Sequence, residues 1–200
     1  MSDTLWSPRI FTTNGFVKDN IVGDIRALDV GCGGRKLLGA VGMDSLKLSG
    51  VDVVHNIDSC PWPFKDDSFD LVLMNHSLEH AQDIIKTLEE THRILNKGGR
   101  VVIQVPYFRC VDAYNDPTHK HFFTARTLDY IIKDSGLSKY KYTNKLFTKK
   151  GFWYGWPHSS KNPFVRVLKS FIHKHSDFYD QYLSLIVSNK CLTWELEAVK

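Results

Sequence analysis

The sequence predicts an α/β sandwich of three layers, with a mostly parallel sheet of about seven strands that ends in an antiparallel strand. The first observation is a series of short, nearly unbroken apolar runs between residues 27 and 106, typical of strands that are covered on both faces. The second is that turn-rich or helix-like segments separate these runs, as they do in a parallel sheet flanked by helices. The third is the final run LTWELEAVK, which suits a closing strand.

The first half of the chain contains five expected strands, at 27–30, 41–43, 51–55, 71–75 and 100–105. Between the last two, the segment AQDIIKTLEETHRILNKGG has apolar residues at helical spacing, and Gly98 and Gly99 are expected to end this helix. A second helix is predicted to begin at Thr124, a good N-cap residue, and to end at Gly136.

The chain becomes basic and aromatic beyond Lys139, in SKYKYTNKLFTKKGFWYGWPH. The early part of this segment alternates as a strand does, with one wet and one buried face, although lysines between aromatic residues also suit RNA binding. The turn-like GFWYGWPH is interpreted as a pocket wall or lid over a substrate. The following PFVRVLKSFIHKH predicts an amphipathic helix, by default packed on the sheet and alternatively lying on a membrane surface.

The composition is that of a globular protein, with 200 residues, 42% of them hydrophobic, and a formal net charge of +4. Such a mild charge does not demand a nucleic acid or an anionic membrane as partner. No two cysteines form a C-x-x-C pair, which disfavours zinc-finger and thioredoxin-like sites and suits reduced thiols. The N-terminus does not resemble a secretory signal, and no apolar run approaches the roughly 20 residues that span a bilayer. We therefore expect a cytoplasmic protein.

A glycine turn directly follows the first expected strand, in LDVGCGG. Glycines let the backbone approach a ligand closely, and exposed N–H groups can bind a carboxylate or a phosphate. The third glycine of the dinucleotide motif G-x-G-x-x-G would fall on Lys36, so this turn is not that motif. Taken alone, it is equally compatible with a tight turn that binds nothing.

Polar residues follow the next strands, at the sheet edge where open α/β folds bind ligands. Asp44 ends the second strand in GMD, where its carboxylate suits the hydroxyls of a ribose. Ile57 and Asp58 follow the third strand and suit an adenine, and Asn75 and His76 come where the fourth strand ends.

In LDVGCGG, GMD, NIDSCPWPFKDDSFDLVLMNHSLEH and LNKGG, the chain closely resembles class I S-adenosylmethionine-dependent methyltransferases of the type 11 group. The resemblance covers residues 27–105, and it implies a Rossmann-like fold, S-adenosyl-L-methionine as the cofactor and methyl transfer as the activity. The cofactor-binding residues that it implies are Gly31, Cys32, Gly33, Asp44, Ile57, Asp58, Asn75 and His76.

The resemblance also implies a role for these residues. Gly31 and Gly33 would lie beside the methionine part of the cofactor, with Asn75 and His76 near its methyl group. Asp44 would bind the ribose, while Ile57 and Asp58 would bind the adenine. Asp29 is expected to shape the glycine loop rather than to touch the ligand.

One departure from the family concerns the first crossover connection. Only residues 31–40 separate the first two strands, whereas a parallel crossover usually needs about a dozen residues or more. We favour a compact, non-helical connection over a different placement of the strands. We further expect residues 6–22 to cover the face of the sheet that a connecting helix would shield. Arg35 or Lys36 would supply positive charge for the cofactor carboxylate, although a solvated surface pair is the preferred interpretation.

These patterns predict one domain over residues 1–200. Residues 1–24 form its N-terminal cover, 25–106 the cofactor-binding core, and 107–200 the acceptor-side loop, helices and closing strands. The densest set of chemically active residues on the acceptor side lies at 112–124, after the fifth strand. Its DPTHKHFFT resembles a segment of small type 11 relatives linked to glycan or cell-surface biosynthesis.

His119 is the first candidate for a general base or acceptor-orienting group, with Asp116 and His121 behind it. The alternative is that Asp116 begins a turn and His119 caps the next helix. We expect no metal, because these residues and Asp112 lack a standard metal-ligand spacing. His80 is expected to be a packed or hydrogen-bonded histidine rather than a base.

The sequence therefore predicts methyl transfer to oxygen or nitrogen of a small molecule or saccharide. An RNA or protein methyltransferase is the alternative within the same fold, suggested by the basic aromatic tail. A cofactor-binding regulatory or scaffold protein without turnover is the alternative from another class.

Overall fold

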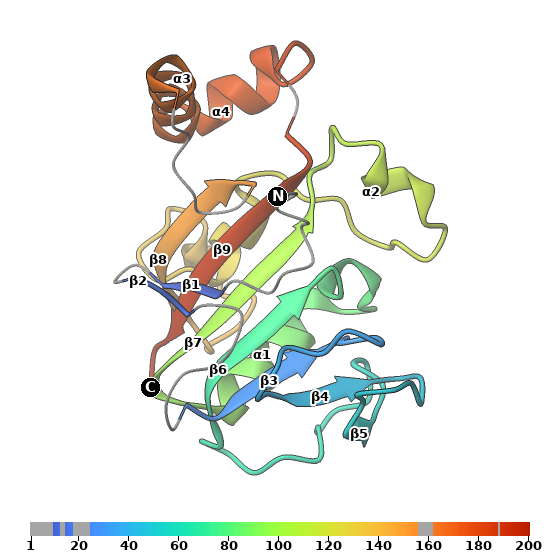
Figure 1. Cartoon of the computed structure of the whole chain (residues 1–200). Helices are drawn as coiled ribbons and strands as arrows, with labels where there is room; N and C mark the ends of the chain where they lie inside the picture. The colour runs from blue at the N-terminus through green and yellow to red at the C-terminus, as the bar shows by residue number, and fades with distance from the viewer. Residues whose placement is uncertain (1–9, 13–14, 18–24, 156–161, 188) are drawn as a thin grey trace.

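The computed structural model describes residues 10–12, 15–17, 25–155, 162–187 and 189–200 (Figure 1). Its centre is a seven-stranded sheet with the order β5-β4-β3-β6-β7-β9-β8. The strands are β3 (Ala27–Val30), β4 (Val41–Asp44), β5 (Val53–Val54), β6 (Phe69–Asn75), β7 (Leu95–Pro106), β8 (Phe147–Tyr154) and β9 (Cys191–Ala198). The pairs from β5 to β7 are parallel, whereas β9 is antiparallel to both β7 and β8. The predicted mostly parallel sheet with an antiparallel closing strand is confirmed.

Helix α1 (Ile84–Ile94) connects β6 to β7 and is the helix predicted from the apolar periodicity. It begins at Asp83, whose carboxylate accepts a hydrogen bond from the Lys86 amide at 3.0 Å. It ends earlier than the predicted glycine stop, because Leu95 already pairs with Phe69 in the sheet. The apolar side of α1 packs against the sheet through residues such as Leu88 and Ile94.

The predicted helix from Thr124 to Gly136 is wrong. The chain instead forms the 3-10 helices η2 (Thr127–Ile131) and η3 (Ser138–Tyr140). The cause is a long-range contact, because Ile132 adopts an extended conformation and forms a bridge with Phe147. The Lys133 amide also donates to the Phe147 carbonyl at 2.8 Å, which draws the backbone toward β8 and out of a helix.

The aromatic segment after Lys139 is also arranged differently from the prediction. Strand β8 begins only at Phe147, and Gly151–Tyr154 belongs to it rather than to a lid. Phe147 and Tyr154 are buried in the core, and the partly buried Phe152 packs against it. The rest of the predicted lid, from residue 156, lies outside the described residues.

Helix α3 (Pro163–Lys174) confirms the predicted amphipathic helix, and Asn162 caps it by accepting from the Phe164 amide at 2.9 Å. It lies with α4 (Ser176–Phe178) beyond the ends of β8 and β9, as Figure 1 shows. Its buried residue is Ile172, whereas Phe164 is 75% exposed. Packing on the sheet is therefore limited to one part of this helix. The π-helical turn η4 (Tyr179–Leu183) follows α4.

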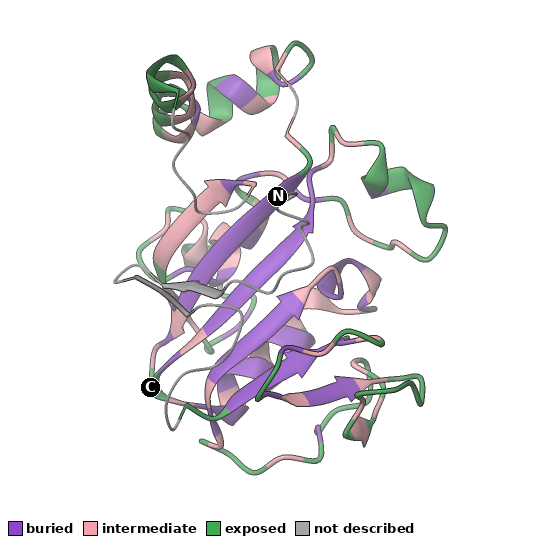
Figure 2. Cartoon of the chain, viewed as in Figure 1, coloured by how far each residue is buried: buried purple, intermediate pink, exposed green. Residues whose placement is uncertain are grey.

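Figure 2 shows that the central strands of the sheet are largely buried. The two faces of the sheet have separate cores. The larger one lies on the face that α1 covers. The smaller one lies on the opposite face, where its members are Ala27, Leu37, Ala40, Leu71, Leu73 and Val102. Leu37 is fully buried there, and its amide donates to the Asp29 carboxylate at 2.8 Å.

This anchoring confirms the predicted compact connection after β3, because residues 31–40 contain no helix. Asp29 holds the connection in place, as expected from the sequence. The connection from β4 to β5 is also free of helix. The predicted N-terminal cover lies mostly outside the described residues, which include only the hairpin β1 (Ile10–Thr12) and β2 (Gly15–Val17). In the described part of the chain, no helix is both long and apolar enough to cross a bilayer.

Candidate functional site

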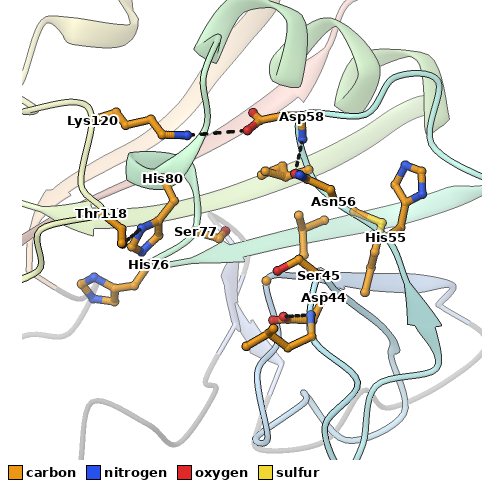
Figure 3. A pocket seen from close by; sticks show the side chains of 15 residues that line it. Asp44, Ser45, His55, Asn56, Asp58, His76, Ser77, His80, Thr118 and Lys120 are labelled. Atoms are coloured by element: carbon orange, nitrogen blue, oxygen red, sulfur yellow. Dashed lines mark hydrogen bonds and ion pairs between the residues drawn. The ribbon is translucent and has the colours of Figure 1, made fainter.

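A pocket of about 650 Å³ opens at the carboxyl ends of β3, β4 and β6 (Figure 3). This is the edge at which the sequence predicts the ligand site. The first helical turn after β6, η1 (Leu78–His80), contributes to its wall. The lining residues are Val30, Gly31, Met43, Asp44, Ser45, Leu46, His55, Asn56, Ile57, Asp58, His76, Ser77, His80, Thr118 and Lys120.

The glycine turn after β3 is held against the end of β4. Gly31 has a φ of +70°, a conformation that glycine adopts readily. The amides of Gly31 and Cys32 both donate to the Met43 carbonyl, at 2.8 and 3.2 Å, and the Gly33 amide donates to Asp44 at 2.9 Å. These three N–H groups are therefore used within the protein, contrary to the expectation that the turn offers them to a carboxylate.

Asp44 lies at the pocket wall with a fixed orientation (Figure 3). One carboxylate oxygen accepts from the Gly33 amide and the other from the Leu46 amide, each at 2.9 Å. Each oxygen of a carboxylate has a second lone pair, so Asp44 retains the capacity to accept from a ligand hydroxyl. Leu46 is 61% exposed and adds an apolar surface to the same wall.

The loop after β5 brings Ile57 and Asp58 to the pocket. Asp58 accepts from the Gln82 amide at 2.7 Å, and its other oxygen lies 3.7 Å from the Lys120 ammonium. Figure 3 shows Lys120 and Asp58 facing each other from two different loops. The Trp62 indole donates to the Ile57 carbonyl at 3.0 Å and so fixes this loop from behind.

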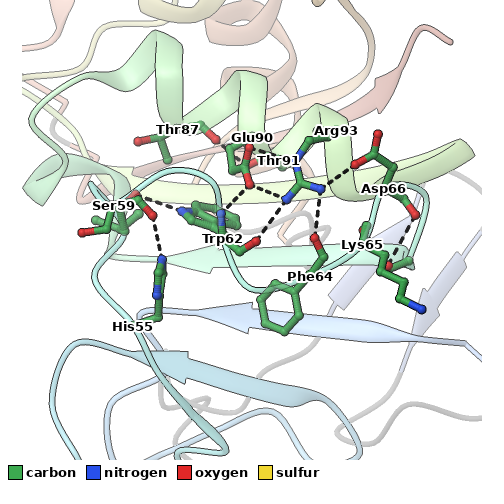
Figure 4. A network of polar contacts seen from close by, with 12 residues as sticks. His55, Ser59, Trp62, Phe64, Lys65, Asp66, Thr87, Glu90, Thr91 and Arg93 are labelled. Carbon is green, nitrogen blue, oxygen red and sulfur yellow. Dashed lines mark hydrogen bonds and ion pairs between the residues drawn. The ribbon is translucent and has the colours of Figure 1, made fainter.

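A polar network anchors the loop that carries Trp62 to α1 (Figure 4). Glu90 on α1 accepts from the Trp62 amide at 2.6 Å and from the Arg93 guanidinium. Arg93 also donates to the Phe64 carbonyl at 2.9 Å and to Asp66 at 2.6 Å. The Glu90 carboxylate raises the pKa of the Arg93 guanidinium further above its usual value. This network positions Ile57 and Asp58 through Trp62.

The other wall of the pocket begins directly after β6. His76 has a φ of +55°, an unfavourable conformation for a residue with a side chain, and its amide donates to the Gln104 carbonyl at 2.9 Å. Its Nδ1 lies 3.2 Å from the Glu79 carboxylate, which is fully buried beneath the pocket. Asn75 is not among the residues that line the pocket, and its Oδ1 atom is buried.

The acceptor-side loop after the short helix α2 (Asp112–Asn115) meets this wall. The Lys120 amide donates to the Glu79 carbonyl at 2.9 Å, and the Thr118 hydroxyl lies 2.9 Å from His80 Nδ1. Thr118 in turn donates to Asp116 at 2.6 Å, and this bond lowers the pKa of the Asp116 carboxyl. The loop is thus fixed to η1 at the mouth of the pocket.

The three predicted catalytic residues lie near the pocket but not among its lining residues. His119 is 8% exposed at its side chain, and its Nδ1 donates to the Ala113 carbonyl at 3.0 Å. His121 donates from Nε2 to the Ala81 carbonyl at 2.9 Å, and Asp116 is exposed. His80 is hydrogen-bonded, as expected, but it also lines the pocket.

Two titratable groups at the glycine turn have pKa values that differ from the ordinary ones. Burial raises the pKa of the Asp29 carboxyl from 3.8 to about 6. Burial also raises the pKa of the Cys32 thiol to about 11, so this thiol stays protonated at neutral pH. Cys32 and Gly33 do not line the pocket.

Of the predicted cofactor-binding residues, the structure brings five together at the pocket, namely Gly31, Asp44, Ile57, Asp58 and His76. The lining residues that were not among the predicted cofactor-binding residues are Val30, Met43, Ser45, Leu46, His55, Asn56, Ser77, His80, Thr118 and Lys120. Ser45 and Leu46 follow Asp44 directly, so their position in the chain was a usable signal. No local signal distinguishes Thr118 and Lys120 from His119 between them.

The comparisons with known proteins agree with this architecture. A family model described as a methyltransferase domain matches residues 12–142. The demethylmenaquinone methyltransferase of Streptomyces avermitilis is 37% identical over 76 residues, which are 38% of this chain and 29% of that protein. The enzyme of the same name from Lysinibacillus sphaericus is 27% identical over 121 residues, 60% of this chain and 44% of that protein. The chain therefore spans less than half of the length of these relatives.

Solved structures give the same result for the fold. The crystal structure of an S-adenosylmethionine-dependent methyltransferase from Mesorhizobium loti has a TM-score of 0.55 and 15% sequence identity. The superposition covers 88% of this chain and 92% of that chain. A structural likeness at 15% sequence identity supports the same fold. It does not by itself specify the function, which depends on the residues of the site.

Proposed function

Because the chain belongs to the methyltransferase domain family and has the fold of S-adenosylmethionine-dependent methyltransferases, we propose that it transfers a methyl group to oxygen or nitrogen of a small molecule or saccharide. The observation that carries this proposal is the pocket at the carboxyl edge of the sheet, where Asp44 ends β4 and Asp58 follows β5. Ligands of open α/β sheets bind at this edge.

The residues of the pocket fit S-adenosyl-L-methionine, which supplies an activated methyl group when bound. Asp44 accepts from the ribose hydroxyls, for which its oxygens retain lone pairs. Leu46 and Ile57 provide apolar surface for the adenine, while Asp58 accepts from the adenine amino group. Gly31 and His76 lie at the methionine end of the pocket. In this proposal Cys32 and Gly33 shape the turn from outside the pocket, and Asn75 supports His76 from the strand.

The acceptor enters from the side formed by His80, Thr118 and Lys120. Methyl transfer is accelerated mainly when the acceptor atom is held close to the methyl group and in line with the bond that breaks. The imidazoles of His80 and His119 can orient the acceptor or accept its proton. Their ring centroids lie 4.8 Å apart. We also propose that residues 25–106 bind the cofactor and that residues 107–200 form the acceptor side.

A small-molecule acceptor is supported by the relatives named demethylmenaquinone methyltransferase, since that name specifies a small molecule. The RNA alternative finds less support. Lys149 and Lys150 lie 3.6 Å from Asp129 and 3.1 Å from Glu197, so their charges are already paired. We therefore expect these two lysines to make no salt-sensitive contact with single-stranded RNA.

The proposal is tested by measuring release of S-adenosylhomocysteine from S-adenosylmethionine with panels of small hydroxyl and amine acceptors, saccharides and RNA. We expect turnover with a member of the first two panels. His119→Ala should lower turnover while cofactor affinity stays unchanged, whereas His173→Ala, on the distant helix α3, should alter neither. Turnover with RNA alone would contradict the acceptor class, and cofactor binding without turnover would favour a regulatory or scaffold protein.

A further inference from the structure

Three side chains beside the pocket converge in a way that methyl transfer by itself does not require. Glu79 and His80 belong to η1, and His119 belongs to the acceptor-side loop. Each offers one ligand atom, and the three atoms all lie within 4.8 Å of one another. We propose that Glu79, His80 and His119 bind a divalent transition-metal ion at the acceptor side of the pocket.

The hydrogen bonds of His119 leave its Nε2 atom available as a ligand. Its Nδ1 lies 3.0 Å from the Ala113 carbonyl, which can only accept, so in the neutral ring Nδ1 carries the proton. Nε2 then has a free lone pair, and it lies 3.9 Å from a Glu79 carboxylate oxygen. A bond from Nδ1 to a backbone carbonyl is the usual way in which metal-binding histidines are oriented.

The same reasoning applies to His80 through two hydrogen bonds. The Thr118 hydroxyl has one proton, and it donates that proton to the Asp116 carboxylate at 2.6 Å. Thr118 must therefore accept from His80 Nδ1, which lies 2.9 Å away. This bond leaves Nε2 of His80 as a second unprotonated nitrogen, on a residue that lines the pocket.

Glu79 supplies the negative charge of the proposed site, and a cation would stabilise its buried carboxylate. Its side chain is fully buried, and its Oε2 atom has no hydrogen-bond partner among the described residues. The other oxygen, Oε1, is the one that lies 3.9 Å from His119 Nε2, and it also lies 3.2 Å from His76 Nδ1. A buried carboxylate with one unsatisfied oxygen is costly unless it is paired or coordinates a metal. A cation held by Glu79, His80 and His119, whose ligand atoms lie within 4.8 Å of one another, supplies the positive charge that this carboxylate requires.

The donor set determines the class of metal. Two imidazole nitrogens and one carboxylate oxygen suit Zn²⁺ or Fe²⁺ better than Ca²⁺ or Mg²⁺, which prefer oxygen ligands. Three protein ligands leave coordination positions open, as in catalytic zinc sites. Because His80 lines the pocket, such a position can bind an acceptor oxygen. A hydroxyl bound to the cation ionises at lower pH, which makes it a better methyl acceptor.

The test measures metal binding directly, with the chelator-treated full chain titrated calorimetrically with Zn²⁺. We expect one equivalent to bind, and the thermal unfolding midpoint to rise with Zn²⁺ because the ion stabilises the folded state. Glu79→Gln and His119→Gln should each weaken this binding by at least about tenfold, a loss that changes around a metal commonly produce. The matched control is His121→Gln, since His121 is in the same loop and bonds to the Ala81 carbonyl instead. It should keep the bound equivalent.

Absence of Zn²⁺ binding by the folded chain would overturn the proposal. The same holds if Glu79→Gln and His119→Gln retain the equivalent, because the ion would then bind to other histidines or to thiols. Should Glu79→Gln fail to fold, His119→Gln and His80→Gln provide the decisive comparison. Titrating His119→Gln with S-adenosylmethionine distinguishes this result from a failure of the proposed function, since His119 does not line the pocket.

Discussion

Substitution of Gly31 by alanine tests whether the glycine turn has the geometry described for it. Gly31 has a φ of +70°, which costs a residue with a Cβ atom about 1–2 kcal/mol. The new Cβ would also lie 2.5 Å from the Ser77 Cβ atom, closer than such atoms can approach. Overpacking of this kind typically costs about 1–3 kcal/mol. We therefore expect Gly31→Ala to lower the free energy of unfolding by about 2–5 kcal/mol.

The assay is equilibrium unfolding in urea, with Gly33→Ala as the matched control. Gly33 has a φ of +54°, but its added Cβ would meet nothing within 4 Å, so only the conformational cost of about 1–2 kcal/mol applies. In the double variant Gly31→Ala/Ser77→Gly, the overlapping atoms of Ser77 are absent and part of the lost stability should return. Equal losses for the two single alanine variants, without recovery in the double variant, would refute the described contact between the turn and Ser77.

Two further predictions concern the supports of the pocket. The raised pKa of Asp29, about 6 in the folded state against the usual 3.8, means that the folded chain binds more protons than the unfolded chain in this window. Stability should therefore fall by up to about 3 kcal/mol as the pH rises from 4 to 6. Asp29→Asn should remove this fall in thermal unfolding, and an unchanged pH dependence would contradict the assignment. Arg93→Gln should lower the free energy of unfolding by about 3 kcal/mol, because it leaves the nearly buried Glu90 carboxylate without its cationic partner. It should also weaken cofactor binding, whereas an effect within 0.5 kcal/mol, about that of a surface change, would show that the network does not anchor the loop.

The parallel half of the fold was predictable because its signals are local. The strands from Ala27 to Pro106 are short apolar runs, and α1 has a regular apolar periodicity with Asp83 as its cap. The failures have long-range causes. Thr124 is a good helix start in the sequence, but pairing of Ile132 with Phe147 holds that segment outside a helix. No local sequence pattern predicts the contact between Ile132 and Phe147, because the two residues belong to different segments of the chain.

The candidate site divides in the same way. Asp44, Asp58 and His76 could be found from the sequence because each lies at or shortly after the end of a strand, at the same edge of the sheet. The approach of His119 to Glu79 could not, because 39 positions along the chain separate the buried carboxylate from the imidazole that lies 3.9 Å from it. In the sequence, no metal was expected from the spacing of Asp112, Asp116, His119 and His121. The fold instead brings together a different set of ligands, Glu79, His80 and His119.

The central claim is that the pocket beside Asp44 binds S-adenosylmethionine, and calorimetric titration tests it most directly. The matched control is Asp52→Ala, because Asp52 accepts from the Gly42 amide at 2.7 Å and from Lys36 at 2.6 Å but does not line the pocket. We expect saturable binding of S-adenosylmethionine and S-adenosylhomocysteine, weakened by about 1–3 kcal/mol in Asp44→Ala and little changed in Asp52→Ala. If the folded chain binds neither compound, or if Asp44→Ala binds them as tightly as the unaltered chain, the claim is contradicted.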